Sequence, residues 1–156
     1  MMFIIRDKNK QFRLTIIDYE YLTSEIVEDL NWLCISIFAS DLKAEWSASG
    51  PYVRTFDLLE MQSWFLNMKE GKQIPKRLDF MEHELSFEYY EGKHEFSVNL
   101  DYDLHPKGKH YRMDTDSEYK IIFSLSEINI DSLLVSLESL VNKFPIRSFQ
   151  SNSPTT

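Results

Sequence analysis

The feature that most constrains the fold is an unbroken alternation of polar and apolar residues over positions 95–104. Successive side chains of a strand point to opposite faces of a sheet, so this pattern predicts one long strand with a single buried face. Strands of this kind are typical of antiparallel sheets. The apolar positions are Phe96, Val98, Leu100, Tyr102 and Leu104, and the polar positions are Glu95, Ser97, Asn99, Asp101 and Asp103.

Seven other segments have the composition of strands and are joined by short polar links. Residues 32–39 have apolar side chains on both faces, which predicts a strand that is buried on each side. Gly50-Pro51 is expected to end the strand that precedes it, because both residues disrupt regular pairing. The predicted strands cover residues 2–5, 11–17, 32–39, 43–48, 77–81, 85–90 and 119–125.

Two segments have the period of an amphipathic helix. The first covers residues 55–70, with Thr55 expected as its N-cap and Gly71 just past its end. The second, residues 130–144, has apolar residues at i, i+3, i+4 and i+7 spacing, and Pro145 ends it. The order ββββ-α-ββββ-α therefore predicts an α+β fold. We expect a largely antiparallel sheet of about eight strands with two amphipathic helices packed on it.

Length and composition fit one domain in a reducing compartment. The chain has 156 residues, 43% of them hydrophobic, which is enough to bury a sizeable core. Residues 1–147 are expected to form this domain, and residues 148–156 a polar, flexible tail. Cys34 is the single cysteine, so no disulfide can form within the chain. No stretch has the character of a signal peptide or a membrane span, so we expect a cytoplasmic protein without membrane contact.

The charge is acidic and unevenly distributed. The chain has 17 basic and 25 acidic residues, a formal net charge of −8. Such a protein repels phosphate backbones, which argues against nucleic acid as the main partner. It favours basic protein partners, because charge sign steers association. Residues 81–147 hold 13 acidic and 7 basic side chains, so the second half is the acidic half.

The strongest catalytic candidate is a set of three residues, Asp101, Asp103 and His105. On one strand these side chains point the same way, so two carboxylates and an imidazole can share a metal ion. The competing interpretation is a solvated outer strand face, which a one-sided antiparallel strand requires. Cys34 lies in an apolar run, and the four glycines form no phosphate-binding motif. We therefore predict no catalytic residue, no metal and no cofactor, with a metal-dependent hydrolase as the alternative hypothesis.

Aromatic residues interleaved with carboxylates indicate a protein interface instead. Tyrosine anchors interfaces because it buries a large area and keeps a polar tip. Tyr90 is expected to face solvent, whereas the alternation turns Tyr89 and Tyr102 toward the core. An acidic rim around tyrosine suits a basic partner. The predicted partner-binding residues are Glu88, Tyr90, Glu91, Glu95, Asp101, Asp103, Asp114 and Asp116.

A series of short motifs is dispersed along the chain. The motifs are Asn31-Trp32-Leu33, Trp46, Thr55, Trp64-Phe65, Leu85-Ser86-Phe87-Glu88 and Phe144-Pro145-Ile146-Arg147. In order and spacing the series resembles the WapI family of immunity proteins over roughly residues 1–147. Two departures are visible. His83 and Glu84 stand where we expect a proline, and the loop at 105–117 is longer and more basic than we expect.

The resemblance implies a binding protein rather than an enzyme. Members of this family bind and neutralise the C-terminal toxin domain of a secreted polymorphic toxin, which is a nuclease in the archetype. The expected partner is a cognate, basic toxin domain, occluded stoichiometrically by a monomer or weak homodimer. A non-catalytic adaptor or scaffold protein is the remaining alternative. The matched motifs are expected to determine the fold, and the contacts to lie on the acidic strand face and loop.

Overall fold

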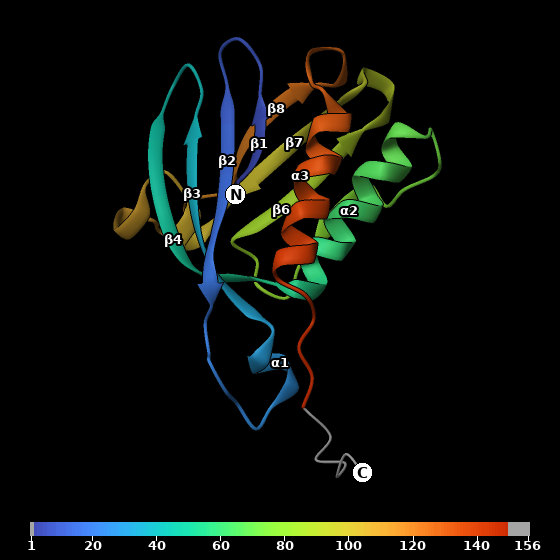
Figure 1. The fold of residues 1–156 in the computed structure, drawn as a ribbon. Helices are drawn as coiled ribbons and strands as arrows, with labels where there is room; N and C mark the ends of the chain where they lie inside the picture. Colours follow the sequence, from blue (N-terminus) through green and yellow to red (C-terminus); the bar gives the residue numbers. More distant parts are fainter. Residues whose placement is uncertain (1, 150–156) are drawn as a thin grey trace.

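The computed structural model describes residues 2–149, which form two antiparallel sheets and three α-helices (Figure 1). The sheets have the strand orders β1-β2-β3-β4 and β5-β6-β7-β8, so neighbours in sequence are neighbours in space. The first sheet contains β1 (Met2–Arg6), β2 (Gln11–Tyr19), β3 (Trp32–Ser40) and β4 (Glu45–Arg54). The second contains β5 (Arg77–Asp79), β6 (Leu85–Tyr90), β7 (Glu95–Leu100) and β8 (Tyr119–Ser124). The helices are α1 (Val27–Leu30), α2 (Thr55–Lys69) and α3 (Ile130–Lys143).

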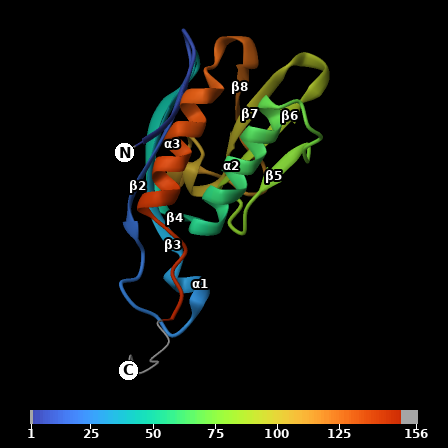
Figure 2. The same cartoon turned by 45° about the vertical axis from the view of Figure 1, so that its right-hand side comes forward.

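Helices α2 and α3 lie side by side on the inner side of the two sheets (Figures 1 and 2). Phe65 of α2 is fully buried and contacts both sheets. Its ring centroid lies 5.9 Å from that of Phe3 in β1 and 5.5 Å from those of Phe87 in β6 and Phe96 in β7. The buried apolar side chains of both sheets and both helices therefore form one continuous core.

The predicted α+β class, the antiparallel pairing and the two packed helices are confirmed. The eight strands are divided between two sheets. The short helix α1 lies between β2 and β3, in residues 20–31, which we call the acidic connector. None of the helices in residues 2–149 is long and apolar enough to cross a membrane. The predicted tail at 148–156 lies outside the described residues, apart from Ser148 and Phe149.

Two predictions about the first sheet are wrong. Strand β3 is buried on one face only, because α2 and α3 cover the inner side and leave Trp32, Cys34 and Phe38 half-buried. Strand β4 does not stop at Gly50-Pro51 but continues to Arg54. It is an edge strand, where the missing N–H of proline is tolerated, and a bulge in its pairing with β3 absorbs the irregularity.

The long alternating strand is also shorter than predicted. Strand β7 ends at Leu100, and residues 102–104 form a turn of 3₁₀ helix with Tyr102 at φ 46°. The reason is that its pairing partners end there: Leu100 stands opposite both Leu85 of β6 and Tyr119 of β8. Without a neighbouring strand on either side, Asp101 turns and its carboxylate accepts a hydrogen bond from the Tyr102 amide.

The start of α2 differs from the prediction as well. Thr55 is the first helical residue rather than the N-cap, and its hydroxyl donates to the Asn31 side chain. The N-cap position is occupied by Arg54, whose amide and guanidinium both donate to the buried carboxylate of Asp57. The carboxylate at the third position of the helix thus reaches back to the amide of the N-cap residue, as the acidic residue of a capping box does.

Candidate functional site

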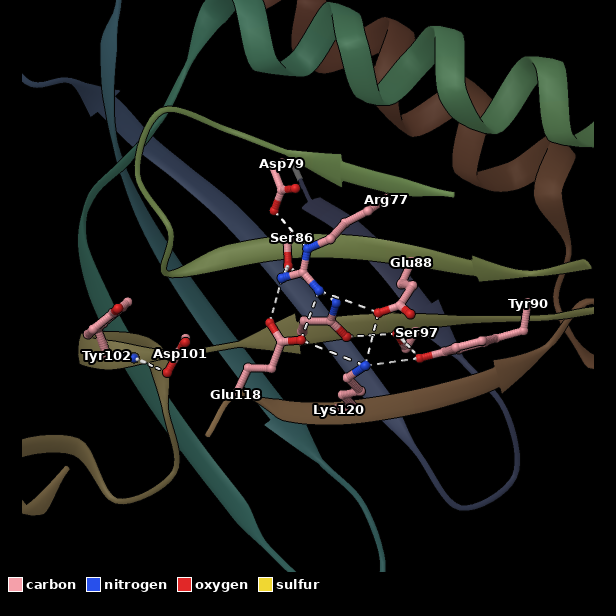
Figure 3. Close-up of polar contacts among 11 residues, drawn as sticks. Arg77, Asp79, Ser86, Glu88, Tyr90, Ser97, Asp101, Tyr102, Glu118 and Lys120 are labelled. Carbon is pink, nitrogen blue, oxygen red and sulfur yellow. Dashed lines mark hydrogen bonds and ion pairs between the residues drawn. The ribbon is translucent and has the colours of Figure 1, made fainter. Parts of the chain in front are cut away.

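The predicted interface on β6 and β7 belongs to the outer face of the second sheet, the face turned away from α2 and α3 (Figure 3). Strand alternation sends Phe87, Phe96 and Val98 into the core and polar side chains outward. We call this outer surface the polar sheet face. It comprises Arg77, Asp79, Ser86, Glu88, Tyr90, Ser97, Asn99, Glu118 and Lys120.

Arg77 is the centre of the polar sheet face. Its guanidinium forms a bidentate pair with Glu118, with N···O distances of 2.6 and 2.8 Å, and also donates to Asp79 and Ser86 at 2.9 Å. Planar pairs of this kind are the strong ones, because two charge-assisted hydrogen bonds act together. Hydrogen bonding to Arg77 holds the pKa of the Glu118 carboxyl below its usual range.

The remaining polar side chains of this face are also paired internally. Lys120 Nζ lies 2.9 Å from a carboxylate oxygen of Glu88 and 3.4 Å from the Tyr90 hydroxyl. Beneath these long side chains, Ser97 and Asn99 are at most 1% exposed and are hydrogen-bonded to each other. The predicted contact residues Glu88 and Tyr90 therefore hold this face together, with their polar atoms directed to neighbours in the same chain (Figure 3).

The loop that follows β7 engages three of the predicted aspartates. Hydrogen bonding to Asp101 raises the pKa of Tyr111 to about 12. Asp103 accepts a 2.6 Å hydrogen bond from Tyr52 of β4, so it links the loop after β7 to the first sheet. Asp116 pairs with the ammonium of Lys107 and accepts from the Arg112 amide at 2.7 Å, which lowers its pKa.

The hypothesis of a metal site at Asp101, Asp103 and His105 is not supported by the geometry. The three residues do not share a face, because β7 ends before them. His105 is buried, and its Nδ1 accepts a 3.1 Å hydrogen bond from the Lys107 amide. Over residues 2–149 no group of three or more His, Cys, Asp or Glu side chains is arranged to hold a metal ion.

Within the described part of the chain, three predicted contact residues have carboxylates that form neither an ion pair nor a hydrogen bond: Glu91, Glu95 and Asp114. Glu91 and Asp114 are exposed, and Glu95 is half-buried at the start of β7. Glu91 lines a shallow depression with Tyr89 and Tyr90 at the β6–β7 turn. The structure thus divides the predicted set into residues whose side chains are bonded within the chain and residues whose carboxylates are not.

A second polar centre was not predicted from the sequence, and we call it the Asn31 junction. Asn31 is fully buried and makes four side-chain hydrogen bonds. Its amide donates to the carbonyls of Val27 and Arg147 at 2.9 Å, and its Oδ1 accepts from the Thr55 hydroxyl at 2.9 Å and the Arg147 amide at 2.7 Å. It therefore ties the segment before β3 to the start of α2 and to the C-terminal segment.

The side chain of Arg147 extends this junction along the acidic connector. Its guanidinium donates to the backbone carbonyls of Tyr21, Leu22 and Leu30 and lies 3.8 Å from the ring centroid of Tyr19. The Tyr19 hydroxyl in turn donates to the carbonyl of Pro145 at 2.6 Å. The C-terminal segment is thus hydrogen-bonded to the loop that contains α1, and the two ribbons lie side by side in Figures 1 and 2.

The family model named immunity protein WapI-like matches residues 2–145 of the chain. The protein belongs to this immunity protein family. Neither a curated protein nor a solved structure matches the chain. The match covers both sheets, all three helices and the loop that follows β7.

Several of the dispersed motifs of this immunity protein supply side chains that connect distant parts of the fold. Asn31 and Thr55 come from separate motifs and meet at the Asn31 junction with Arg147 of a third. Trp64 packs in the core, and its indole donates to the Pro75 carbonyl at 2.9 Å. No local pattern could have indicated the junction, because its members are 24 and 116 residues apart. The only signal in the sequence was their presence in the same series of motifs.

Proposed function

We propose that this immunity protein binds and neutralises the C-terminal toxin domain of a cognate polymorphic toxin. The mechanism is stoichiometric occlusion of the toxin's active site, with no turnover by the immunity protein. The observation that carries the proposal is the family match over residues 2–145, which includes nearly the whole chain. The protein acts as a monomer or weak homodimer in the cytoplasm, where an incoming or newly made toxin would meet it.

The charge of the chain supports a basic partner. With a net charge of −8, the protein attracts a toxin domain that carries lysine and arginine for contact with phosphates, as nuclease domains do. Opposite charges raise association rates toward roughly 10⁸–10⁹ M⁻¹s⁻¹ at low salt. Fast capture suits an inhibitor that must reach the toxin before it acts, so we propose a nuclease as the toxin.

The contacts of the candidate catalytic residues Asp103 and His105 support a binding role without catalysis. Asp103 and His105 each bond to a neighbouring group of the same chain and hold the loop after β7 in place. Within the predicted interface, Glu91, Glu95 and Asp114 are the proposed contact residues, because over residues 2–149 their carboxylates form neither ion pairs nor hydrogen bonds. The side chains of Glu88, Tyr90, Asp101 and Asp116 are hydrogen-bonded within the chain and would shape the surface around these contacts.

We expect the cognate toxin domain to be encoded beside this gene, and co-expression with it tests the function. The proposal expects rescue of growth, a 1:1 complex by size-exclusion chromatography with light scattering, and an association rate that falls as salt is raised. A catalytically inactive toxin domain should bind equally well, because occlusion needs no turnover. Cells that die despite the immunity protein, with no complex at micromolar concentrations, would contradict the proposal.

A further inference from the structure

The loop with α1 and the C-terminal segment meet at one end of the molecule (Figures 1 and 2), and both carry exposed apolar side chains. Leu22 is 84% exposed, Ile26 54% and Ile146 46%, and the neighbouring Tyr21 and Val27 are also exposed. Scattered exposed apolar residues are normal on a soluble protein, but neighbouring ones indicate an interaction site. Here Arg147, the residue after Ile146, donates hydrogen bonds from its guanidinium to the backbone carbonyls of Tyr21 and Leu22.

Residues 18–29 are acidic, and no basic side chain of the described residues pairs with their carboxylates. Between Arg13 and Lys43 the sequence has no lysine or arginine, and residues 18–29 hold five carboxylates. None of the five forms an ion pair with a described residue, and the nearby Arg147 guanidinium is occupied by backbone carbonyls. Burial, followed by the charge of Asp29, raises the pKa of Glu20. The five are Asp18, Glu20, Glu25, Glu28 and Asp29.

The backbone of this segment is held in place although its side chains are exposed. The Asn31 junction fixes its C-terminal end through the carbonyl of Val27, and Arg147 fixes its middle through those of Tyr21 and Leu22. A loop that is ordered before binding loses less conformational entropy in the complex, which raises affinity. Exposed apolar side chains on a fixed backbone are the arrangement expected of interface anchors.

We propose that this acidic arm, residues 18–30 together with Ile146, is the main surface that docks the toxin domain, with Glu91, Glu95 and Asp114 as secondary contacts. The inference rests on the proposed function and gives the partner a stated chemistry: an apolar depression that receives Leu22 and Ile26, ringed by lysine or arginine side chains that face the five carboxylates. A second copy of this chain is a poor occupant, because pairing two arms would bring ten carboxylates together. A basic partner gains both the apolar burial and the charge complementarity.

The apolar part is tested by L22K against a control with the same exposure. Leu42 is 82% exposed at the β3–β4 turn, so L42K makes the same chemical change on another surface. Calorimetric titration with the inactive toxin domain encoded beside the gene should give about a 100-fold higher Kd for L22K, as loss of an interface anchor does. The L42K variant should stay within about threefold of the wild type.

The charged part is tested by E25K/E28K against E45K/E127K, two charge reversals of equal size on exposed glutamates. Association rates measured at low salt should fall about tenfold for the arm variant and about twofold for the control. Circular dichroism verifies that each variant is folded.

The outcomes separate this inference from the proposed function. If the wild type neutralises the toxin and L22K and E25K/E28K bind as tightly, the arm is not the docking surface and the function stands. If the wild type itself neither binds nor neutralises, both proposals are overturned. If the wild type forms a dimer that L22K abolishes, the occupant is a second copy, and the inference fails.

Discussion

The polar sheet face and the acidic arm are both rich in carboxylates, yet they differ in where the opposing charges lie. On the sheet face, Arg77 and Lys120 pair with Glu88 and Glu118 within the same chain. On the arm, the five carboxylates have no ion-pair partner among the described residues. A surface whose charges are already paired gains little from a basic partner. The arm's charges are compensated only in a complex, which is why we place the docking surface there.

The largest effect tests the anchor of the arm. Replacing Asn31 with alanine removes four hydrogen bonds and leaves the Thr55 hydroxyl without its acceptor, so N31A should lose about 3 kcal/mol of unfolding free energy. Urea unfolding measures it. The control is N129A, which removes only the exposed N-cap of α3 and should cost about 1 kcal/mol. Equal losses in the two variants would mean that the junction does not anchor the arm.

The second effect tests the internal pairing of the polar sheet face. E118Q should lose about 1 kcal/mol at pH 7, because it weakens the bidentate pair with Arg77. The folded pKa of Glu118 is lowered, so the stability it contributes is present above its ordinary value of 4.5 and is lost as the pH falls through the folded value. The difference between wild type and E118Q should therefore shrink in acid. An E127Q control, without an ion pair among the described residues, should show no such dependence.

A smaller effect compares the two surfaces in binding. E91K/E95K reverses the two available carboxylates at the edge of the sheet face and should slow association with the toxin domain about threefold, against about tenfold for E25K/E28K. Stopped-flow mixing at low salt measures both. A larger loss for E91K/E95K than for the arm variant would place the main contact on the sheet face, as the sequence first suggested.

The smallest effect concerns stability alone. Neutralising Glu25 and Glu28 together should change unfolding free energy by less than about 0.5 kcal/mol, because these side chains are exposed and lack an ion-pair partner among the described residues. A slight stabilisation is the expected direction, since mutual repulsion in the arm is reduced. If E25Q/E28Q instead loses as much stability as E118Q, the arm's carboxylates have partners in the fold and the contrast between the surfaces disappears.

Sequence patterns located most elements, but neither the end of β7 nor the Asn31 junction. The period of residues 85–90 and 130–144 reflects burial of one face, which local spacing reports directly, and both elements are present. The alternation through Leu104 predicted a strand that is too long. A strand continues only while a neighbouring strand pairs with it, and the neighbours of β7 end opposite Leu100. The metal hypothesis at Asp101, Asp103 and His105 failed with it.

The sequence by itself determined the α+β class, the acidic character and, through its dispersed motifs, the immunity protein family. These properties depend on composition, local period and order along the chain. Only the tertiary structure decided which carboxylates are already paired and which are free. It also revealed that Asn31 and Arg147, 116 residues apart, hold the arm together. Pairing of charges and of buried polar groups depends on contacts between distant segments, and these exist only once the sheets and helices have packed.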